Sequence, residues 1–274
     1  MRVIGRDAAT GSGLVAVTHA IASTGSTTSA FPNASSTGYS GTLTDSPGSM
    51  SIGTDSTTIS DLHITGRVTV NADNVTIKNC FVDNPGDYYV VMVYGTNCTI
   101  EDCELLGDDS AQCSLVAESG ATFTARRVNA HGCQDGITMN NDCGLYDSYI
   151  HDLSGDSSSH NDGVNADGYT GWTVDHCTIL NDRTQTSCIW VGDPRNGASA
   201  GYLTNCLLAG GGYSVYAGPG TSDGIHVTGN QFSTRFFANG GYYGPVTSWE
   251  DTNNVWSDNT WADGPNAGQP VSSS

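Results

Sequence analysis

Short runs of alternating apolar and polar residues recur along the chain, and Asn, Asp, Gly or Ser interrupt them at close intervals. No segment shows the 3.6-residue period of an amphipathic helix. Alternation in short runs is typical of β-strands that bury one face and expose the other. The pattern therefore predicts an all-β protein.

One short motif recurs eight times, and it predicts the architecture. It consists of an apolar residue, any residue, Asn, Asp or His, a Cys or other small residue, any residue, and a second apolar residue. The copies are ISDLHI (59–64), IKNCFV (77–82), IEDCEL (100–105), ARRVNA (125–130), LYDSYI (145–150), VDHCTI (174–179), LTNCLL (203–208) and VTGNQF (227–232). Steps of 18 to 29 residues without helical stretches or an LxxLxL framework favour a parallel β-helix over leucine-rich repeats.

A second set of strands follows the same period. Its apolar anchors, separated by 22 to 27 residues, are Val91, Leu115, Ile137, Val164, Ile189 and Val215. Because side chains alternate along a strand, we expect the anchors to point inward and their neighbours outward. The predicted outward residues are Met92, Tyr94, Val116, Glu118, Thr138, Asn140, Asn165, Asp167, Trp190 and Tyr216.

Equivalent residues of successive coils should stack about 4.8 Å apart and form ladders. One position of the repeated motif predicts a ladder of turn-forming side chains that bond backbone groups of their own coil and the next: Asn79, Asp102, Asp147, His176 and Asn205. The following position predicts a ladder of buried thiols: Cys80, Cys103, Cys177 and Cys206. Burial raises the pKa of a thiol, so these cysteines are predicted to be structural and not catalytic.

The ends of the chain lack the coil pattern. Residues 1–30 are expected to form an arm, a cap or an attachment to a larger particle, and residues 31–233 the β-helix. Residues 234–262 are rich in aromatic side chains and are expected to cap the open end of the solenoid, with ligand binding as the alternative. Residues 263–274 are expected to be a disordered tail.

Composition narrows the functional classes. The chain holds 9 Lys+Arg against 28 Asp+Glu, a formal net charge of −19, which argues against a nucleic-acid partner. No apolar stretch is long enough for a membrane span, and the N-terminus lacks a standard signal peptide. Nine cysteines without a CxxC pair do not predict a metal cluster.

Two stacked aromatics end the outward ladder of the second set of strands. Trp190 and Tyr216 resemble a carbohydrate platform, because sugars present apolar ring faces to aromatics and hydroxyl groups to polar side chains. The alternative is that a loop at residues 194–201 covers them. The candidate substrate-binding residues are Glu118, Asn140, Asn165, Asp167, Trp190, Asp193, Arg195 and Tyr216.

A second group of residues is suited to acid–base chemistry. The motif alignment stacks His131 on His151, and the short segments that follow bring in Asp135, His160 and Asp162. Two imidazole–carboxylate sets converging on one edge of the solenoid would suit catalysis or metal binding. The alternative is that Asp135 and Asp162 only cap turns and that the histidines are solvated.

Lyase and hydrolase chemistry make different demands on these residues. A lyase needs a base and a cation that neutralises the uronate carboxylate. Lys78 is predicted to lie away from the groove, which leaves calcium or the arginines Arg126, Arg127, Arg183 and Arg195. A hydrolase needs two carboxylates: Glu118 and Asp167, two coils apart, are near an inverting separation, whereas Asp135 and Asp162, on adjacent coils, are nearer a retaining one.

Four blocks of sequence carry a family resemblance: FPNASSTGYSGTLT (31–44), HNDGVNADG (160–168), GGGYSVYAGPG (210–220) and FFANGGYYGPVTSW (236–249). Together they resemble an actinobacterial and actinobacteriophage branch of the pectate-lyase-like superfamily. The resemblance implies a right-handed parallel β-helix, here of about eight coils with a C-terminal aromatic cap. Members outside phages are typically secreted, so the missing signal peptide favours a virion protein.

The leading expectation is therefore a bacteriophage virion protein, a minor tail or surface-decorating component, that engages host or environmental glycans. Its partners would be polysaccharide or cell-envelope glycan and other virion proteins, with a homotrimer as one assembly and no nucleic acid or membrane. The first alternative is a secreted polysaccharide lyase or glycoside hydrolase. No cofactor is required for it, although calcium could serve a lyase as the cation. The second is a purely architectural decoration protein.

Overall fold

The computed structural model describes residues 30–156, 158–192 and 195–274. Residues 31–274 form one compact unit, and the described residues contain strands and turns but no helix. Most of the predicted N-terminal arm, residues 1–29, lies outside the described residues.

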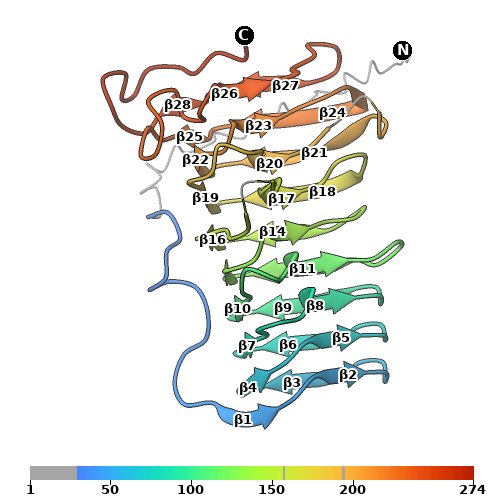
Figure 1. Ribbon diagram of the computed structural model, residues 1–274. Coiled ribbons are helices and arrows are strands. Elements are labelled where there is room, and N and C mark those ends of the chain that lie inside the picture. The colour runs from blue at the N-terminus through green and yellow to red at the C-terminus, as the bar shows by residue number, and fades with distance from the viewer. Residues whose placement is uncertain (1–29, 157, 193–194) are drawn as a thin grey trace, which may run out of the picture. The chain divides into compact units, whose positions relative to one another are not determined.

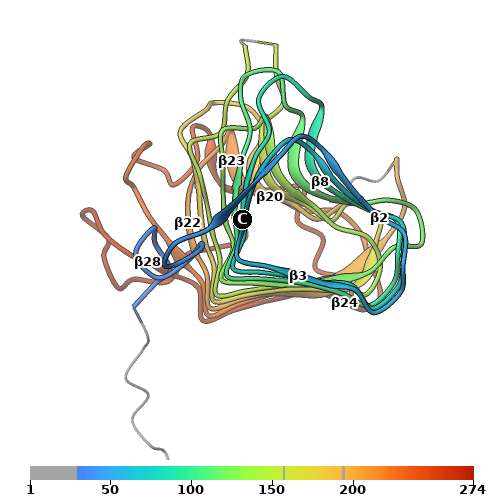
Figure 2. The ribbon, with the colours of Figure 1, turned by 90° about the horizontal axis from the view of Figure 1, so that it is seen from below.

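Three parallel sheets enclose the core, and each coil of the chain adds one strand to each of them in turn (Figures 1 and 2). Sheet A contains β1 (Thr44–Pro47), β4 (Leu62–Thr65), β7 (Phe81–Asp83), β10 (Glu104–Leu106), β13 (Asn129–His131), β16 (Tyr149–His151), β19 (Thr178–Asn181), β22 (Leu207–Gly210), β25 (Gln231–Phe232) and β28 (Thr260–Trp261). Sheet B contains β2 (Met50–Ile52), β5 (Val68–Val70), β8 (Tyr89–Val93), β11 (Cys113–Ala117), β14 (Asp135–Thr138), β17 (Asp162–Asn165), β20 (Ser187–Trp190), β23 (Tyr213–Tyr216) and β26 (Gly244–Thr247). Sheet C contains β3 (Thr58–Ser60), β6 (Thr76–Lys78), β9 (Cys98–Glu101), β12 (Phe123–Arg126), β15 (Gly144–Tyr146), β18 (Thr170–Asp175), β21 (Ser199–Thr204), β24 (Gly220–Thr228) and β27 (Val255–Ser257). The predicted right-handed parallel β-helix is confirmed.

The repeated motif forms the corner between sheet C and sheet A. The polar residues at its third position have φ angles between 48° and 60°, a left-handed conformation that Asn and Asp tolerate better than most residues. Their side chains bond from coil to coil: Asn79 Nδ2 donates to Asp61 Oδ1 at 2.7 Å, and His176 Nδ1 lies 2.8 Å from Asp147 Oδ1. The positions of this corner ladder are as predicted, but its side chains bond one another from coil to coil instead of bonding backbone groups of the coils.

The core is continuous along the solenoid. Every anchor of the second strand set is fully buried and pairs in sheet B with its equivalent in the next coil, for example Ile137 with Val164 and Ile189 with Val215. The four ladder cysteines are also fully buried, which confirms their predicted position. All nine cysteines are free thiols.

The N-terminal part of the described chain runs back along the outside of the corner ladder. Phe31 stacks on His176 at 6.2 Å, the Gly38 amide donates to the Arg127 carbonyl at 2.9 Å, and the Ser40 amide donates to Asn79 Oδ1 at 2.8 Å. Residues 31–43 therefore cross several coils before β1 begins, seen as the blue segment beside the solenoid in Figure 1.

The C-terminal end differs from the sequence prediction in two ways. Residues 244–261 supply β26, β27 and β28, so the aromatic segment forms the last coil, whose corner residue Asp258 has a φ of 58°. The predicted disordered tail is instead ordered, with Val271 in the core and its carbonyl accepting from Trp256 Nε1 at 2.7 Å. The tail was mispredicted because backbone hydrogen bonds, such as that from the Val271 amide to the Asn259 carbonyl, and one buried apolar residue hold it, and these leave no pattern in the sequence.

Candidate functional site on the outer face of sheet B

The outward ladder of sheet B continues through three coils near the C-terminal end of the solenoid. Asn165 pairs in register with Trp190, and Trp190 pairs with Tyr216. Their inward neighbours Val164 and Ile189 are fully buried, so alternation turns these polar and aromatic side chains outward. The sequence prediction for this part of the ladder is confirmed.

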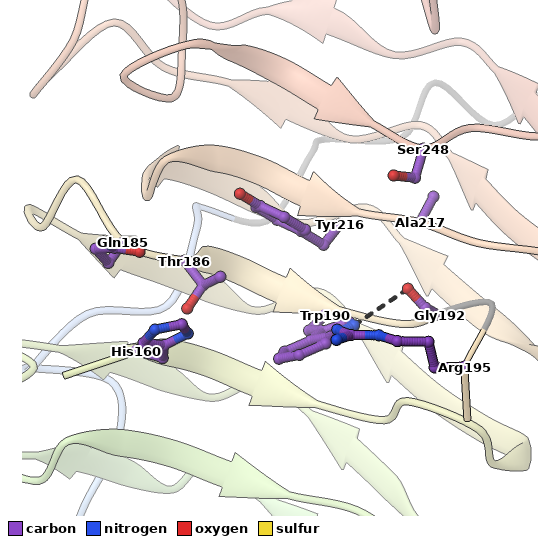
Figure 3. A pocket seen from close by; sticks show the side chains of 9 residues that line it. All are labelled: His160, Gln185, Thr186, Trp190, Gly192, Arg195, Tyr216, Ala217 and Ser248. Atoms are coloured by element: carbon purple, nitrogen blue, oxygen red, sulfur yellow. Dashed lines mark hydrogen bonds between the residues drawn. The ribbon is translucent and has the colours of Figure 1, made fainter. Parts of the chain in front are cut away.

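A cavity of about 380 Å³ opens on this face (Figure 3). Its wall is formed by His160, Gln185, Thr186, Trp190, Gly192, Arg195, Tyr216, Ala217 and Ser248. The volume lies in the range of small-ligand sites, and the wall combines aromatic rings with hydroxyl, amide, imidazole and guanidinium groups. Four residues predicted as functional, His160, Trp190, Arg195 and Tyr216, thus share one cavity.

The two aromatic rings of the cavity are fixed but not covered. Their centroids are 6.3 Å apart with planes inclined by 51°, and both side chains are partly exposed. Trp190 Nε1 donates to the Gly192 carbonyl at 3.1 Å, which holds the indole in place. In Figure 3 the Arg195 side chain points toward Trp190 from the neighbouring loop. That loop borders the cavity and leaves the rings accessible, in contrast to the alternative in which it hides them.

One polar atom in the cavity wall lacks a partner. Thr186 Oγ1 is buried and makes no hydrogen bond among the described residues. Figure 3 shows the hydroxyl directed toward His160, which lies on the neighbouring coil. A buried hydroxyl without a hydrogen-bond partner costs free energy.

Asp135 and Asp162 begin adjacent strands of sheet B and are linked to each other. Asp135 Oδ1 accepts from the Asp162 amide at 2.9 Å, Asp135 Oδ2 accepts from Gln112 Nε2 at 2.9 Å, and the Ser187 hydroxyl donates to Asp162 Oδ1. Both aspartates are the first residues of strands. Each carboxylate accepts a hydrogen bond from a residue of the next coil and does not cap a turn of its own coil. Gly136 needs to be a glycine here because a Cβ would meet the Gly163 carbonyl oxygen.

Burial changes the acidity of this pair. Desolvation raises the pKa of Asp135 to about 6, although the hydrogen bonds from Asp162 and Gln112 and the nearby His160 oppose the shift. Desolvation also raises the pKa of Asp162 well above its ordinary value, and the adjacent Asp135 adds to the shift. The electrostatic influence of Asp162 reaches Tyr216, which lines the cavity. Neither carboxyl group is part of the cavity wall, and both carry protons near neutral pH more readily than ordinary carboxyl groups.

His131 stacks on His151 as predicted, but neither imidazole contacts Asp135 or Asp162. His131 and His151 lie 4.9 Å apart with an interplanar angle of 13°, on the outer face of sheet A. His131 Nε2 is 3.1 Å from Glu104 Oε1, and His151 Nδ1 is 2.6 Å from Asp152 Oδ2. Burial lowers the pKa of His151, and His131 contributes to the shift. These contacts tie the two imidazoles to Glu104 of β10 and to Asp152, directly after β16, whereas Asp135 and Asp162 bond each other and residues at the start of sheet B strands.

The remaining predicted residues fall into three groups. Asn140 is a correction: it is only 4% exposed and donates to the Glu118 carbonyl at 2.8 Å, because β14 ends at Thr138 and outward alternation ends with it. Glu118 and Asp167 follow their strands in turns, and Asn196 Nδ2 donates to Asp167 Oδ2. Asp193 lies outside the described residues.

Four of the candidate basic side chains have other partners and are not part of the cavity wall. Lys78 Nζ lies 2.8 Å from Glu101, Arg126 pairs with Asp147 at 2.6 Å, and Arg127 pairs with Asp102. Arg183 donates to the Leu153 carbonyl. Among the candidate cations for a lyase, Arg195 is the one that lines the cavity.

Sequence reasoning missed Gln185, Thr186 and Ser248 in the cavity wall and Gln112 beside Asp135. A signal existed: the two longest repeat steps, 29 residues each, span 145–203, and their extra residues form several of the loops around the cavity. Within the described residues, no group of three or more His, Cys, Asp or Glu is arranged to hold a metal ion. The same residues include no helix with the length and apolarity to span a bilayer.

Comparison with known proteins adds no relative to this picture. The chain matches no protein-family model, no curated protein and no solved structure. What is established is therefore the parallel β-helix fold with an aromatic, polar cavity on its flank.

Proposed function

We propose that the chain is a bacteriophage virion protein, a minor tail or surface-decorating β-helix, that binds host or environmental glycans in the cavity beside Trp190. The cavity beside Trp190, here called the Trp190 cavity, is the observation that supports glycan binding. It places two accessible rings, Trp190 and Tyr216, among polar groups that include the unpartnered Thr186 hydroxyl. Aromatic faces and hydrogen-bonding groups together are what a sugar ring recognises.

Placement on a virion rests on the resemblance of the four sequence blocks to actinobacteriophage β-helix proteins. Mass spectrometry of purified phage particles checks this part separately. The chain should be found at a fixed copy number per particle, and its absence from particles would exclude a structural virion role.

Glycan binding is tested with a panel of neutral and acidic cell-envelope polysaccharides in affinity electrophoresis. Trp190→Ala and Tyr216→Ala should each weaken retardation by the bound glycan about tenfold or more, because each removes one stacking surface. Tyr202→Ala is the matched control, since Tyr202 is a 49% exposed tyrosine on sheet C. Equal retardation of all the variants and the unmodified protein would contradict the proposal.

A second candidate, glycoside hydrolysis, is favoured by the Asp135–Asp162 pair. A general acid must hold its proton near the working pH, and burial raises the pKa of both carboxyl groups. Adjacent coils bring carboxylates closer than the separation used by inverting enzymes, which points to retention.

Release of reducing ends from the bound glycan tests this candidate. Asp135→Asn, Asp162→Asn and His160→Ala should abolish release, and Asp109→Asn, at an exposed loop position, should not. A product that absorbs as an unsaturated uronate would instead indicate a lyase acting through Arg195. Glycan binding without any product would leave binding as the function.

A further inference from the structure

Aromatic side chains continue beyond the Trp190 cavity in an unbroken row. Tyr213 lies 5.6 Å from Tyr216, Tyr243 lies 5.6 Å from Tyr213, and Tyr242 lies 4.9 Å from Tyr243. Phe237 closes the row at 5.6 Å from Tyr242. The row therefore leads from the cavity across β23 to the loop that precedes β26.

The end of the row is strongly exposed. Tyr242 is 51% and Tyr243 is 62% exposed, and Tyr243 is the most exposed large apolar side chain of the described residues. Neither ring contributes to the buried core. Exposed aromatics gathered in one place mark a binding surface more often than a structural element.

The loop that carries these tyrosines is held rigidly against the solenoid. The amides of Tyr242 and Tyr243 donate to the carbonyls of Gly211 and Gly212, both at 2.8 Å, and the Gly210 amide donates to the Gly240 carbonyl at 2.9 Å. Glycines make this approach possible, since a Cβ on Gly241 would lie 2.9 Å from the Gly212 carbonyl oxygen. A fixed aromatic surface loses little conformational entropy when it binds a ligand.

Charge and shape favour a sugar chain over other occupants. The two segments that carry the four tyrosines of the row, GGGYSVYA (210–217) and FFANGGYY (236–243), contain no ionisable side chain other than tyrosine. A net charge of −19 on the whole chain disfavours polyanions. The row is one ring wide, which is narrow for a protein interface of about 800 Å² per partner.

We infer that the aromatic row, comprising Trp190, Tyr216, Tyr213, Tyr243 and Tyr242, is an extended binding track for a neutral polysaccharide, with the Trp190 cavity holding one end of a chain of several sugar units. This inference rests on the proposed function of the Trp190 cavity. A tyrosine ring and a pyranose ring are similar in size. Tyr213 and Tyr216 are inclined by 78° and Tyr242 and Tyr243 by 89°, so a sugar chain along the row can stack on one ring of each pair and meet the edge of the other.

Dependence of affinity on chain length tests the track. Neutral glucose, mannose and arabinose oligomers, from disaccharide to hexasaccharide, are titrated calorimetrically into the protein. Affinity should rise with length, and Tyr243→Ala and Tyr242→Ala should weaken hexasaccharide binding about tenfold while disaccharide binding stays unchanged. Tyr243→Phe should keep the affinity because the ring remains, and Tyr202→Ala again serves as the control.

The outcomes separate the two proposals. If Trp190→Ala weakens binding and Tyr242→Ala and Tyr243→Ala leave hexasaccharide binding unchanged, the track is wrong and the cavity remains. If Trp190→Ala has no effect either, both proposals fail. If no neutral oligomer in the series binds, the track for a neutral polysaccharide is wrong, and the panel of neutral and acidic polysaccharides decides the cavity. Concentration-dependent self-association that Tyr243→Ala abolishes, without any effect on sugar binding, would show a second copy of the chain as the occupant and would overturn the inference.

Discussion

Replacing Asp135 by asparagine should stabilise the protein at neutral pH and not at acid pH. The variant keeps an oxygen that can accept from the Asp162 amide, as Asp135 Oδ1 does at 2.9 Å. Its new Nδ2 faces Gln112, whose side-chain amide must turn to present its oxygen or lose the hydrogen bond. The main change is that the side chain can no longer ionise.

The magnitude follows from the pKa of Asp135, which burial raises from 3.8 to about 6. A shift of about two units costs the ionised form about 3 kcal/mol in the folded state relative to the unfolded state. The pKa of Asp135 is higher in the folded state than in the unfolded state. The unmodified protein therefore has its full stability below about pH 4, where the carboxyl group is protonated in both states, and loses about this amount as pH rises through about 6. Losing the Gln112 hydrogen bond would cost about 1 kcal/mol, so the net gain above pH 7 is about 2 kcal/mol.

Urea unfolding followed by tryptophan fluorescence between pH 4 and pH 8 measures this difference. The stability of Asp135→Asn relative to the unmodified protein should rise with pH and level off above about pH 7. Asp109→Asn, in the exposed loop before β11, should show no such trend. A stability difference for Asp135→Asn that does not vary with pH would refute the argument that burial governs the acidity of this carboxyl group.

Three further changes probe the solenoid itself. Gly95→Ala should lower the free energy of unfolding by about 3 kcal/mol, measured by urea unfolding, because the added Cβ would collide with the Ala72 carbonyl. Cys103→Ser should cost about 1 kcal/mol or less in the same assay and leave glycan binding intact, since Ser148 occupies the equivalent corner position and donates to the Tyr146 carbonyl at 2.7 Å. Deleting residues 263–274 should lower the thermal midpoint and cost about 3 kcal/mol, because it removes buried Val271 and the acceptor of Trp256 Nε1. An unchanged midpoint would contradict the conclusion that the tail packs onto the core.

The sequence predicts the coils because their geometry repeats. A left-handed corner followed by a buried small residue restricts the amino acids allowed at two positions, so copies such as IEDCEL remain recognisable. The ninth copy, WSDNTW (256–261), escaped recognition because aromatic residues replace the aliphatic ones. Its Asp258 and Asn259 nevertheless occupy the corner and the buried position, with Asn259 Nδ2 donating to the Val227 carbonyl.

The site is less predictable because loops of irregular length form much of it. Trp190 and Tyr216 follow from alternation, since their anchors Ile189 and Val215 are in register. Thr186 and Arg195 lie in loops within one of the two longest repeat steps. Their positions depend on the conformation of these loops, which the repeated motif does not determine. Alternation also predicts an outward side chain at Asn140, which is wrong because β14 ends at Thr138.

The most direct test of the account is a crystal structure of the protein with the tightest-binding neutral oligosaccharide. We expect a sugar ring in the cavity between Trp190 and Tyr216, with further units continuing over Tyr213 toward Tyr243. Sugar density confined to another face, such as the hollow beside Tyr202 on sheet C, would contradict the proposed site.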